Sequence, residues 1–98
     1  MSRPLACAVT LVLVAAAPVT ARDSEPYYRA ELAQSPASNH LIAGGVLWIC
    51  DGTACVAGKG TGRPAVMCKR LAEAASPVMR FSFGDEELAA DDLARCNG

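Results

Sequence analysis

The chain has 98 residues, of which 52% are hydrophobic, and its formal net charge at pH 7 is −1. A chain of this length allows one small domain and excludes a two-domain enzyme. Its 9 Lys and Arg residues are matched by 10 Asp and Glu residues, so it lacks the clustered basic charge of a nucleic-acid or anionic-membrane binder.

The first 21 residues predict an export signal. Arg3 supplies a positive start, residues 5–17 carry no charge, and Val19-Thr20-Ala21 has the small-x-small ending that signal peptidase recognises. We therefore expect cleavage after Ala21 and a single mature domain, residues 22–98, that is periplasmic or secreted. The alternative is an uncleaved membrane anchor. A helix of residues 5–17 would extend only about 20 Å, short of the ~30 Å hydrocarbon core, so we expect no stable anchor after cleavage.

Three segments precede the first predicted turn. Residues 27–33 alternate between apolar and charged side chains, which predicts a half-buried strand. Residues 34–39 have the composition of a linker. Residues 41–50 are the most apolar stretch after the signal and predict the central strand, in which Gly44-Gly45 mark a bulge or a close backbone approach.

The turn signal Asp51-Gly52 predicts that residues 54–57 return as a short partner strand. Residues 58–62 then form a glycine-rich connection, and Pro64 fits the first turn of a helix that Ser76-Pro77 stops. The apolar side chains at helical spacing that should face the core are Met67, Cys68, Leu71, Ala72 and Ala75.

Residues 78–83 predict another strand, with Met79, Phe81 and Phe83 on one face. A turn at Gly84-Asp85 leads to a short helix over residues 88–96. The predicted fold class is α+β. We expect a small antiparallel sheet of three to four strands with two short helices on one face.

Four cysteines remain after Cys7 leaves with the signal: Cys50, Cys55, Cys68 and Cys96. An even number in a short exported chain indicates disulfides, and three pairings are possible. We favour Cys50 with Cys55, because the turn between them brings their sulfur atoms within bridging reach, and therefore Cys68 with Cys96. The spacings do not resemble the close cysteine pairs of zinc ribbons, so we expect no metal.

Two further groups of residues are candidate contacts. Lys59 and Arg63 flank a glycine-rich segment before a helix, where backbone N–H groups can bind an anion; the alternative is a solvated flexible loop. Tyr27 and Tyr28 are candidates for a partner contact, against ordinary packing in a sheet. His40, the one histidine, has no catalytic partner in the sequence, and no catalytic motif or cofactor site is evident.

Several short motifs together resemble a family of small exported four-cysteine proteins of alphaproteobacteria. The matching positions are Tyr27–Leu32, Ile42–Trp48 with Cys50, Cys55, Arg63-Pro64, Cys68, and Leu93–Asn97. The resemblance implies a Gram-negative periplasmic setting and a single framework of four cysteines, and it carries over no catalytic or binding residue. Gly62 stands where such relatives tend to have Ser, which weakens the cap of the following helix.

The sequence therefore predicts an exported, non-enzymatic, disulfide-stabilised domain. We interpret it as a binding or interaction module whose partner is an envelope protein or a polymer. The alternative function is a thiol-redox or metal-binding protein that uses Cys50 and Cys55.

Overall fold

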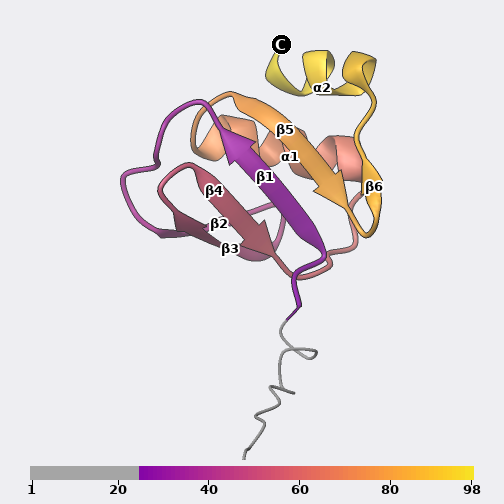
Figure 1. Cartoon of the computed structure of the whole chain (residues 1–98). Coiled ribbons are helices and arrows are strands. Elements are labelled where there is room, and N and C mark those ends of the chain that lie inside the picture. The colour runs from indigo at the N-terminus through magenta and orange to yellow at the C-terminus, as the bar shows by residue number, and fades with distance from the viewer. Residues whose placement is uncertain (1–24) are drawn as a thin grey trace, which may run out of the picture.

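The computed structural model describes residues 25–98, so the expected signal peptide, residues 1–21, lies outside the described residues. Residues 25–98 form one six-stranded sheet and two helices (Figure 1). The strands are β1 (Tyr28–Leu32), β2 (His40–Ala43), β3 (Val46–Asp51), β4 (Ala54–Ala57), β5 (Val78–Phe83) and β6 (Glu86–Glu87). The helices are α1 (Pro64–Ala74) and α2 (Ala90–Asn97).

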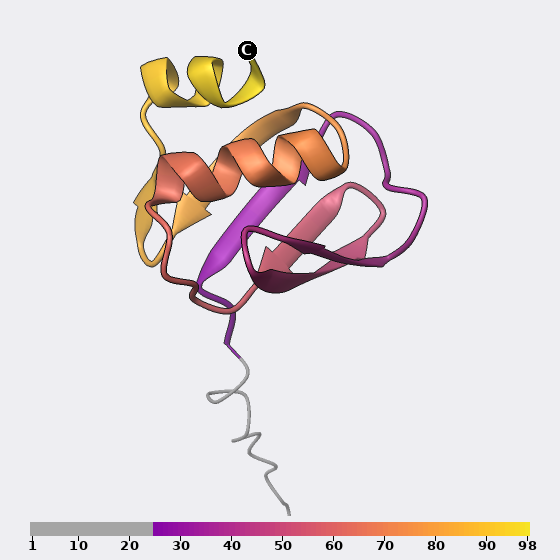
Figure 2. The same cartoon turned by 180° about the vertical axis from the view of Figure 1, so that it is seen from behind.

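The first strand lies inside the sheet rather than at its edge. The spatial order is β2-β3-β4-β1-β5-β6, and every neighbouring pair is antiparallel. Because β4 and β5 are both antiparallel to β1, they run parallel to each other, and parallel strands need a long crossover connection. The α1 helix makes that crossover, and Figure 2 shows it lying across one face of the sheet.

The prediction of three to four strands is wrong, because the sheet has six. Residues 41–50 are not one central strand: Gly44-Gly45 form the two-residue turn between β2 and β3, with φ values of 65° and 79°. A turn of this kind needs positive φ at both central residues, which glycine adopts without steric cost. The sixth strand, β6, follows the turn at Gly84-Asp85, where no strand was expected.

The helices also differ from the prediction, which placed both on one face of the sheet. Only α1 lies across the sheet; α2 lies beside β5 and contacts α1 and β5 (Figures 1 and 2). The position of α2 is fixed by the disulfide between Cys68 of α1 and Cys96, whose Cα atoms are 5.7 Å apart.

The inward face of β5 is shifted by an irregularity in its pairing with β1. Leu32 pairs with Val78 and Glu31 pairs with Arg80, so Met79 has no partner on β1. Val78 and Phe81 consequently face the core, and Met79 is 56% exposed rather than sharing the core face with Phe81. An extra residue of this kind reverses the alternation along a strand.

The core lies between the sheet and α1. The rings of Tyr28, Trp48 and Phe81 pack with centroids 5.8–6.1 Å apart, and Met67 and Leu71 of α1 are buried with them. The Trp48 indole N–H donates to the carbonyl of Ala43, 3.1 Å away, so its polar atom is satisfied inside the core.

The structure contains the disulfide pairing that the sequence favoured. Cys50 and Cys55 lie directly opposite each other on β3 and β4, with their Cα atoms 4.0 Å apart. Both sulfur pairs lie in the buried core, where Cys50, Cys55, Cys68 and Cys96 all belong to the main hydrophobic cluster. The disulfides therefore join elements that also pack together.

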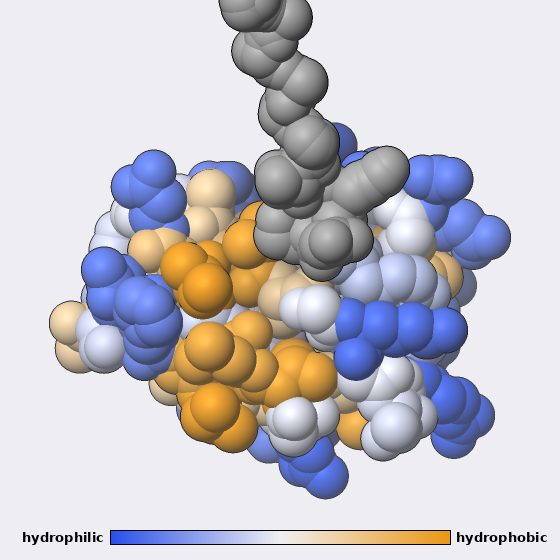
Figure 3. All heavy atoms as spheres, turned by 90° about the horizontal axis from the view of Figure 1, so that it is seen from below, coloured by the Kyte–Doolittle hydropathy of each residue, from blue (hydrophilic) through white to orange (hydrophobic). Residues whose placement is uncertain are grey.

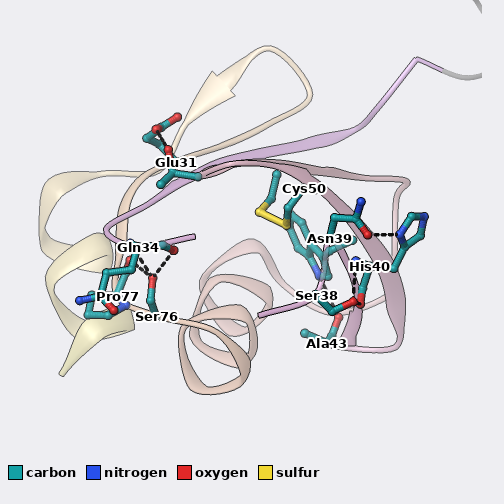
Figure 4. The surroundings of a disulfide bond; sticks show 12 residues. Glu31, Gln34, Ser38, Asn39, His40, Ala43, Cys50, Ser76 and Pro77 are labelled. Carbon is teal, nitrogen blue, oxygen red and sulfur yellow. Dashed lines mark hydrogen bonds between the residues drawn. A yellow bond between two sulfur atoms is a disulfide. The ribbon is translucent and has the colours of Figure 1, made fainter. Parts of the chain in front are cut away.

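Side chains cover backbone groups on the edge strand β2 and on the part of β5 that extends beyond its pairing with the two-residue β6. On β2, the His40 N–H donates to the Ser38 hydroxyl (3.2 Å), which in turn donates to the His40 carbonyl (3.0 Å; Figure 4). On β5, the Val78 N–H donates to Asn97 Oδ1, and Asn97 Nδ2 donates to the Val78 carbonyl, both at 2.7 Å. Each side chain occupies backbone groups that a further strand would otherwise bind.

We expect Asn97→Ala to lower the free energy of unfolding by about 1–3 kcal/mol, because it leaves the N–H and the carbonyl of buried Val78 without partners. Arg95→Ala on the same helix is the control. It removes only an exposed ion pair with Asp92, so its cost should stay within roughly 0–1 kcal/mol. Urea denaturation measures both, and equal losses would contradict the edge role of Asn97.

Candidate functional site

The two faces of the sheet have different surroundings. The inner face packs against α1, and the side chains between the inward ones form an outer face. On β1, Arg29 and Glu31 point outward between buried neighbours, and Arg80 and Ser82 of β5 continue the same face. Such alternation is typical of an antiparallel sheet with one face in water.

On β2, β3 and β4 the outer face is mainly aliphatic rather than charged. On β3, Trp48 and Cys50 face the core, while Leu47 and Ile49 face outward and are 45% and 47% exposed. β2 adds Ile42, which is 66% exposed, and β4 adds Val56.

The register places Ile42 beside Leu47 and Ile49 beside Val56. We call the four residues Ile42, Leu47, Ile49 and Val56 the outer patch. Figure 3, viewed from below, shows hydrophobic side chains gathered on this side of the molecule.

A shallow depression of about 460 Å³ adjoins the outer patch. Aliphatic side chains of β3 and β4 line it, among them Leu47, Ile49 and Val56, together with the charged residues Glu25 and Lys59. Its chemistry suits an apolar group that carries a charge.

Lys59 has a defined neighbour at this depression. Its Nζ lies 5.2 Å from the centre of the Tyr27 ring, a cation–π distance. Tyr27 is half-buried and packs edge-to-face on Tyr28 at a centroid distance of 4.9 Å. Tyr28 is only 1% exposed, and its hydroxyl accepts the Gly60 N–H at 3.3 Å. Of the two tyrosines proposed for a partner contact, only Tyr27 is exposed enough to contact a partner molecule.

The glycine-rich segment packs against Met67. A Cβ atom at Gly62 would lie 2.9 Å from Met67 Sδ, and one at Gly60 would lie 2.8 Å from Val46 Cγ1. These glycines are therefore required for close packing, which differs from the solvated flexible loop considered from sequence.

The start of α1 also offers few donors to an anion. Pro64 has no N–H, and the N–H groups of Val66 and Met67 both donate to the carbonyl of Arg63. Lys59 meanwhile contacts Tyr27. The structure thus gives no support to an anion site shared by Lys59 and Arg63.

The residues with catalytic or metal-binding side chains are dispersed. His40 is exposed on the outer face, and its Nδ1 lies 2.9 Å from Asn39 Oδ1 (Figure 4). Within residues 25–98 there is no group of three or more His, Cys, Asp or Glu side chains arranged to hold a metal ion. No helix in the same range is long and apolar enough to span a membrane.

Sequence analysis missed the outer patch, although a signal was present. Residues 46–50 read Val-Leu-Trp-Ile-Cys, an unbroken apolar run. Such runs are typical of strands covered on both faces, whereas β3 is covered by the protein on one face only. The run alone does not tell which residues face outward; that follows from the pairing of β3 with β2 and β4.

Comparison with known proteins identifies a family. The model of a family of unknown function (DUF8200) matches residues 8–98, which include all the described residues. The chain therefore belongs to this family. No curated protein and no solved structure matches the chain significantly.

We expect Gly60→Ala to lower the free energy of unfolding by about 1–3 kcal/mol, because the new methyl group would overlap Val46. Gly58→Ala in the same segment meets no atom within 4 Å, so it should cost nothing or stabilise by up to ~1 kcal/mol. Thermal or urea unfolding compares the two variants. Equal, negligible effects would show that the segment is not packed as described.

Proposed function

We propose that this member of the DUF8200 family is an exported, non-enzymatic binding module that acts through the outer patch of its sheet. The observation that carries the proposal is the exposure of Ile42, Leu47 and Ile49 on neighbouring strands. Single exposed aliphatic residues are ordinary on protein surfaces, but contiguous ones mark interaction sites. The partner we expect belongs to the cell envelope, as a protein or a polymer.

The distribution of charge on the outer face supports a specific site. Arg29, Glu31 and Arg80 lie on the half formed by β1 and β5, where Arg80 pairs with Glu87 and Glu31 accepts a hydrogen bond from Thr53. On the other half the outer patch is aliphatic, and the polar side chains His40 and Asp51 lie next to Ile49 on β2 and β3. A uniformly solvated sheet has no physical reason for this division, whereas a sheet that binds a partner on β2, β3 and β4 does.

The buried disulfides favour binding over the thiol-redox alternative. Exchange requires a thiolate to attack a disulfide sulfur, so the bond must be accessible. Cys50 and Cys55 belong to the buried core cluster and are only 4% and 1% exposed. The same bond removes the thiolates that a metal site at these residues would need.

Two disulfides in so small a domain are compatible with an oxidising compartment outside the cytoplasm. Export by a cleaved signal remains our proposal for how the chain arrives there. Its expected cleavage point follows Ala21.

The export proposal is tested by the intact mass of the protein recovered from the periplasm after alkylation without reductant. We expect a chain that begins at Arg22, carries no alkyl group and is four hydrogen masses lighter than the reduced form, because both disulfides are formed. A mass that retains residues 1–21 would contradict the cleavage, and alkylated cysteines would favour the redox alternative.

The binding proposal is tested by recovering partners of the tagged protein from an envelope extract over a range of salt concentrations. Ile49→Lys should abolish retention of any reproducible partner, because it places a charge within the outer patch. Met79→Lys is the matched control, since Met79 is a comparably exposed apolar side chain outside the patch. Identical recovery with both variants would contradict a role for the patch.

A further inference from the structure

We propose that the outer face of the sheet binds a second copy of the chain, with Leu47 of each copy inserted into the depression of the other. This inference rests on the binding function proposed above and names the partner of the same surface. In this dimer the two sheets stack face to face, about 10 Å apart, with the facing side chains interdigitated. Its two-fold axis runs along the strand direction between β3 and β4.

The depression provides the space that an inserted side chain needs. Gly58 lines it, and a Cβ atom at Gly58 would meet no atom of the described residues within 4 Å, so the space above this backbone is open. Ile49 and Val56 add aliphatic walls. A leucine side chain inserted there gains apolar contacts and leaves no polar atom of its own without a partner.

The strand register gives this surface the symmetry that a two-fold contact requires. One row of outward side chains runs across four neighbouring strands in the order His40, Ile49, Val56, Arg29. Rotation about an axis between β3 and β4 reverses this row, so Ile49 of one copy packs on Val56 of the other. The same rotation brings His40 opposite Arg29, where a neutral imidazole can accept a hydrogen bond from the guanidinium group.

The next row places the inserted side chain opposite the open space. Leu47 lies two residues before Ile49 on β3, and Gly58 lies two residues after Val56. Because β3 and β4 are antiparallel, these two steps lead in the same direction along the sheet. The rotation that sets Ile49 on Val56 therefore sets Leu47 over Gly58, and it does so twice in the dimer.

The charges on this surface do not exclude an identical copy. Asp51 pairs with Ala54, so after the rotation its carboxylate faces a methyl group rather than a second carboxylate. The charged side chains on the outer face of β1 to β4 and around the depression are the cations Arg29 and Lys59 and the carboxylates Glu25, Glu31 and Asp51. Both signs are present and nearly balance, so the fit of shapes decides which partner binds.

The extent of the contact predicts a weak dimer. Four strands with a length of about five residues cover roughly 19 by 17 Å, or about 320 Å² of flat surface. This is less than the roughly 800 Å² on each partner of a standard interface, so we expect a dissociation constant of about 10–1,000 µM. Stacking of faces also needs no free strand edge, and on β2 the Ser38 hydroxyl already binds the His40 backbone.

The test measures the molar mass of the disulfide-bonded protein by sedimentation equilibrium from about 20 µM to about 2 mM, a range that spans the expected dissociation constant. We expect the mass to rise from that of a monomer toward that of a dimer. Backbone NMR shifts should change with concentration on β3, β4 and Gly58. A monomer at every concentration, a mass that rises past the dimer, or shift changes confined to other faces would overturn the proposal.

Gly58→Leu separates insertion from general hydrophobic association. The new side chain points into open space, so the fold should be kept, but it fills the depression. We expect dimerisation to weaken by about ten-fold or more, since Leu47 can no longer insert. Gly58→Ala is the matched control and should change the dissociation constant by less than about three-fold. Tighter association of Gly58→Leu would show that the surfaces meet without insertion and would overturn the proposal.

Leu47→Ala removes the inserted group itself. It should weaken dimerisation by about ten-fold or more, because the depression of each copy is left empty. Met79→Ala is the control, since Met79 is a comparably exposed apolar side chain on β5, outside the four stacked strands. Equal dissociation constants for the two variants would contradict insertion of Leu47.

The failure of this inference can be separated from that of the binding function. Absence of a dimer, together with loss of a different envelope partner in Ile49→Lys, would overturn the second copy as partner and leave the binding function standing. Absence of a dimer and an unchanged partner recovery in Ile49→Lys would overturn both.

Discussion

The packing of α1 across the sheet is the contact on which the rest of the structure depends. The helix connects the two strands that flank β1, so the sheet cannot be completed unless α1 crosses it. Met67 and Leu71 are buried together with Tyr28, Trp48 and Phe81, the three largest fully buried side chains of the core. Gly60 and Gly62 are needed at this contact, because a Cβ atom at either position would crowd the Met67 side chain.

α1 covers one face of the sheet. How well the other face suits contact with water depends on the side chains that it carries. On the β1 and β5 side the outward residues are charged or polar, whereas on the β2 to β4 side aliphatic side chains predominate and only His40 and Asp51 are polar. The edges are partly closed by Ser38 and Asn97, so approach along the plane of the sheet is restricted. The open side of β3 is thus where the surface is both apolar and accessible.

The elements that depend on local patterning could be predicted from the sequence, and those that depend on pairing could not. The alternation in β1 and the helical spacing in α1 were sufficient to locate them. Gly44-Gly45 suit either a bulge or a turn by composition alone, and the pairing of β2 with β3 decides between them. The exposure of Met79 follows from its lack of a partner on β1, which is a relation between segments far apart in the sequence.

The candidate site also depends on strand pairing and could not be predicted from the sequence alone. Lys59 stood out because of its glycine neighbours, yet its position at an apolar depression depends on Tyr27 and on the strands β3 and β4. The outer patch is assembled from three strands, so no local window of sequence contains it.

The central position of β1 has a consequence for the order in which the protein can assemble. A chain that emerges into a compartment from its N-terminal end presents Tyr28 and Leu32 first, but their neighbours arrive with residues 54–57 and 78–83. The three-stranded meander of β2, β3 and β4 can form while emergence continues, since its contacts are local. β1 lacks one of its two neighbouring strands until residues 78–83 appear, so the sheet cannot be completed before β5 has emerged.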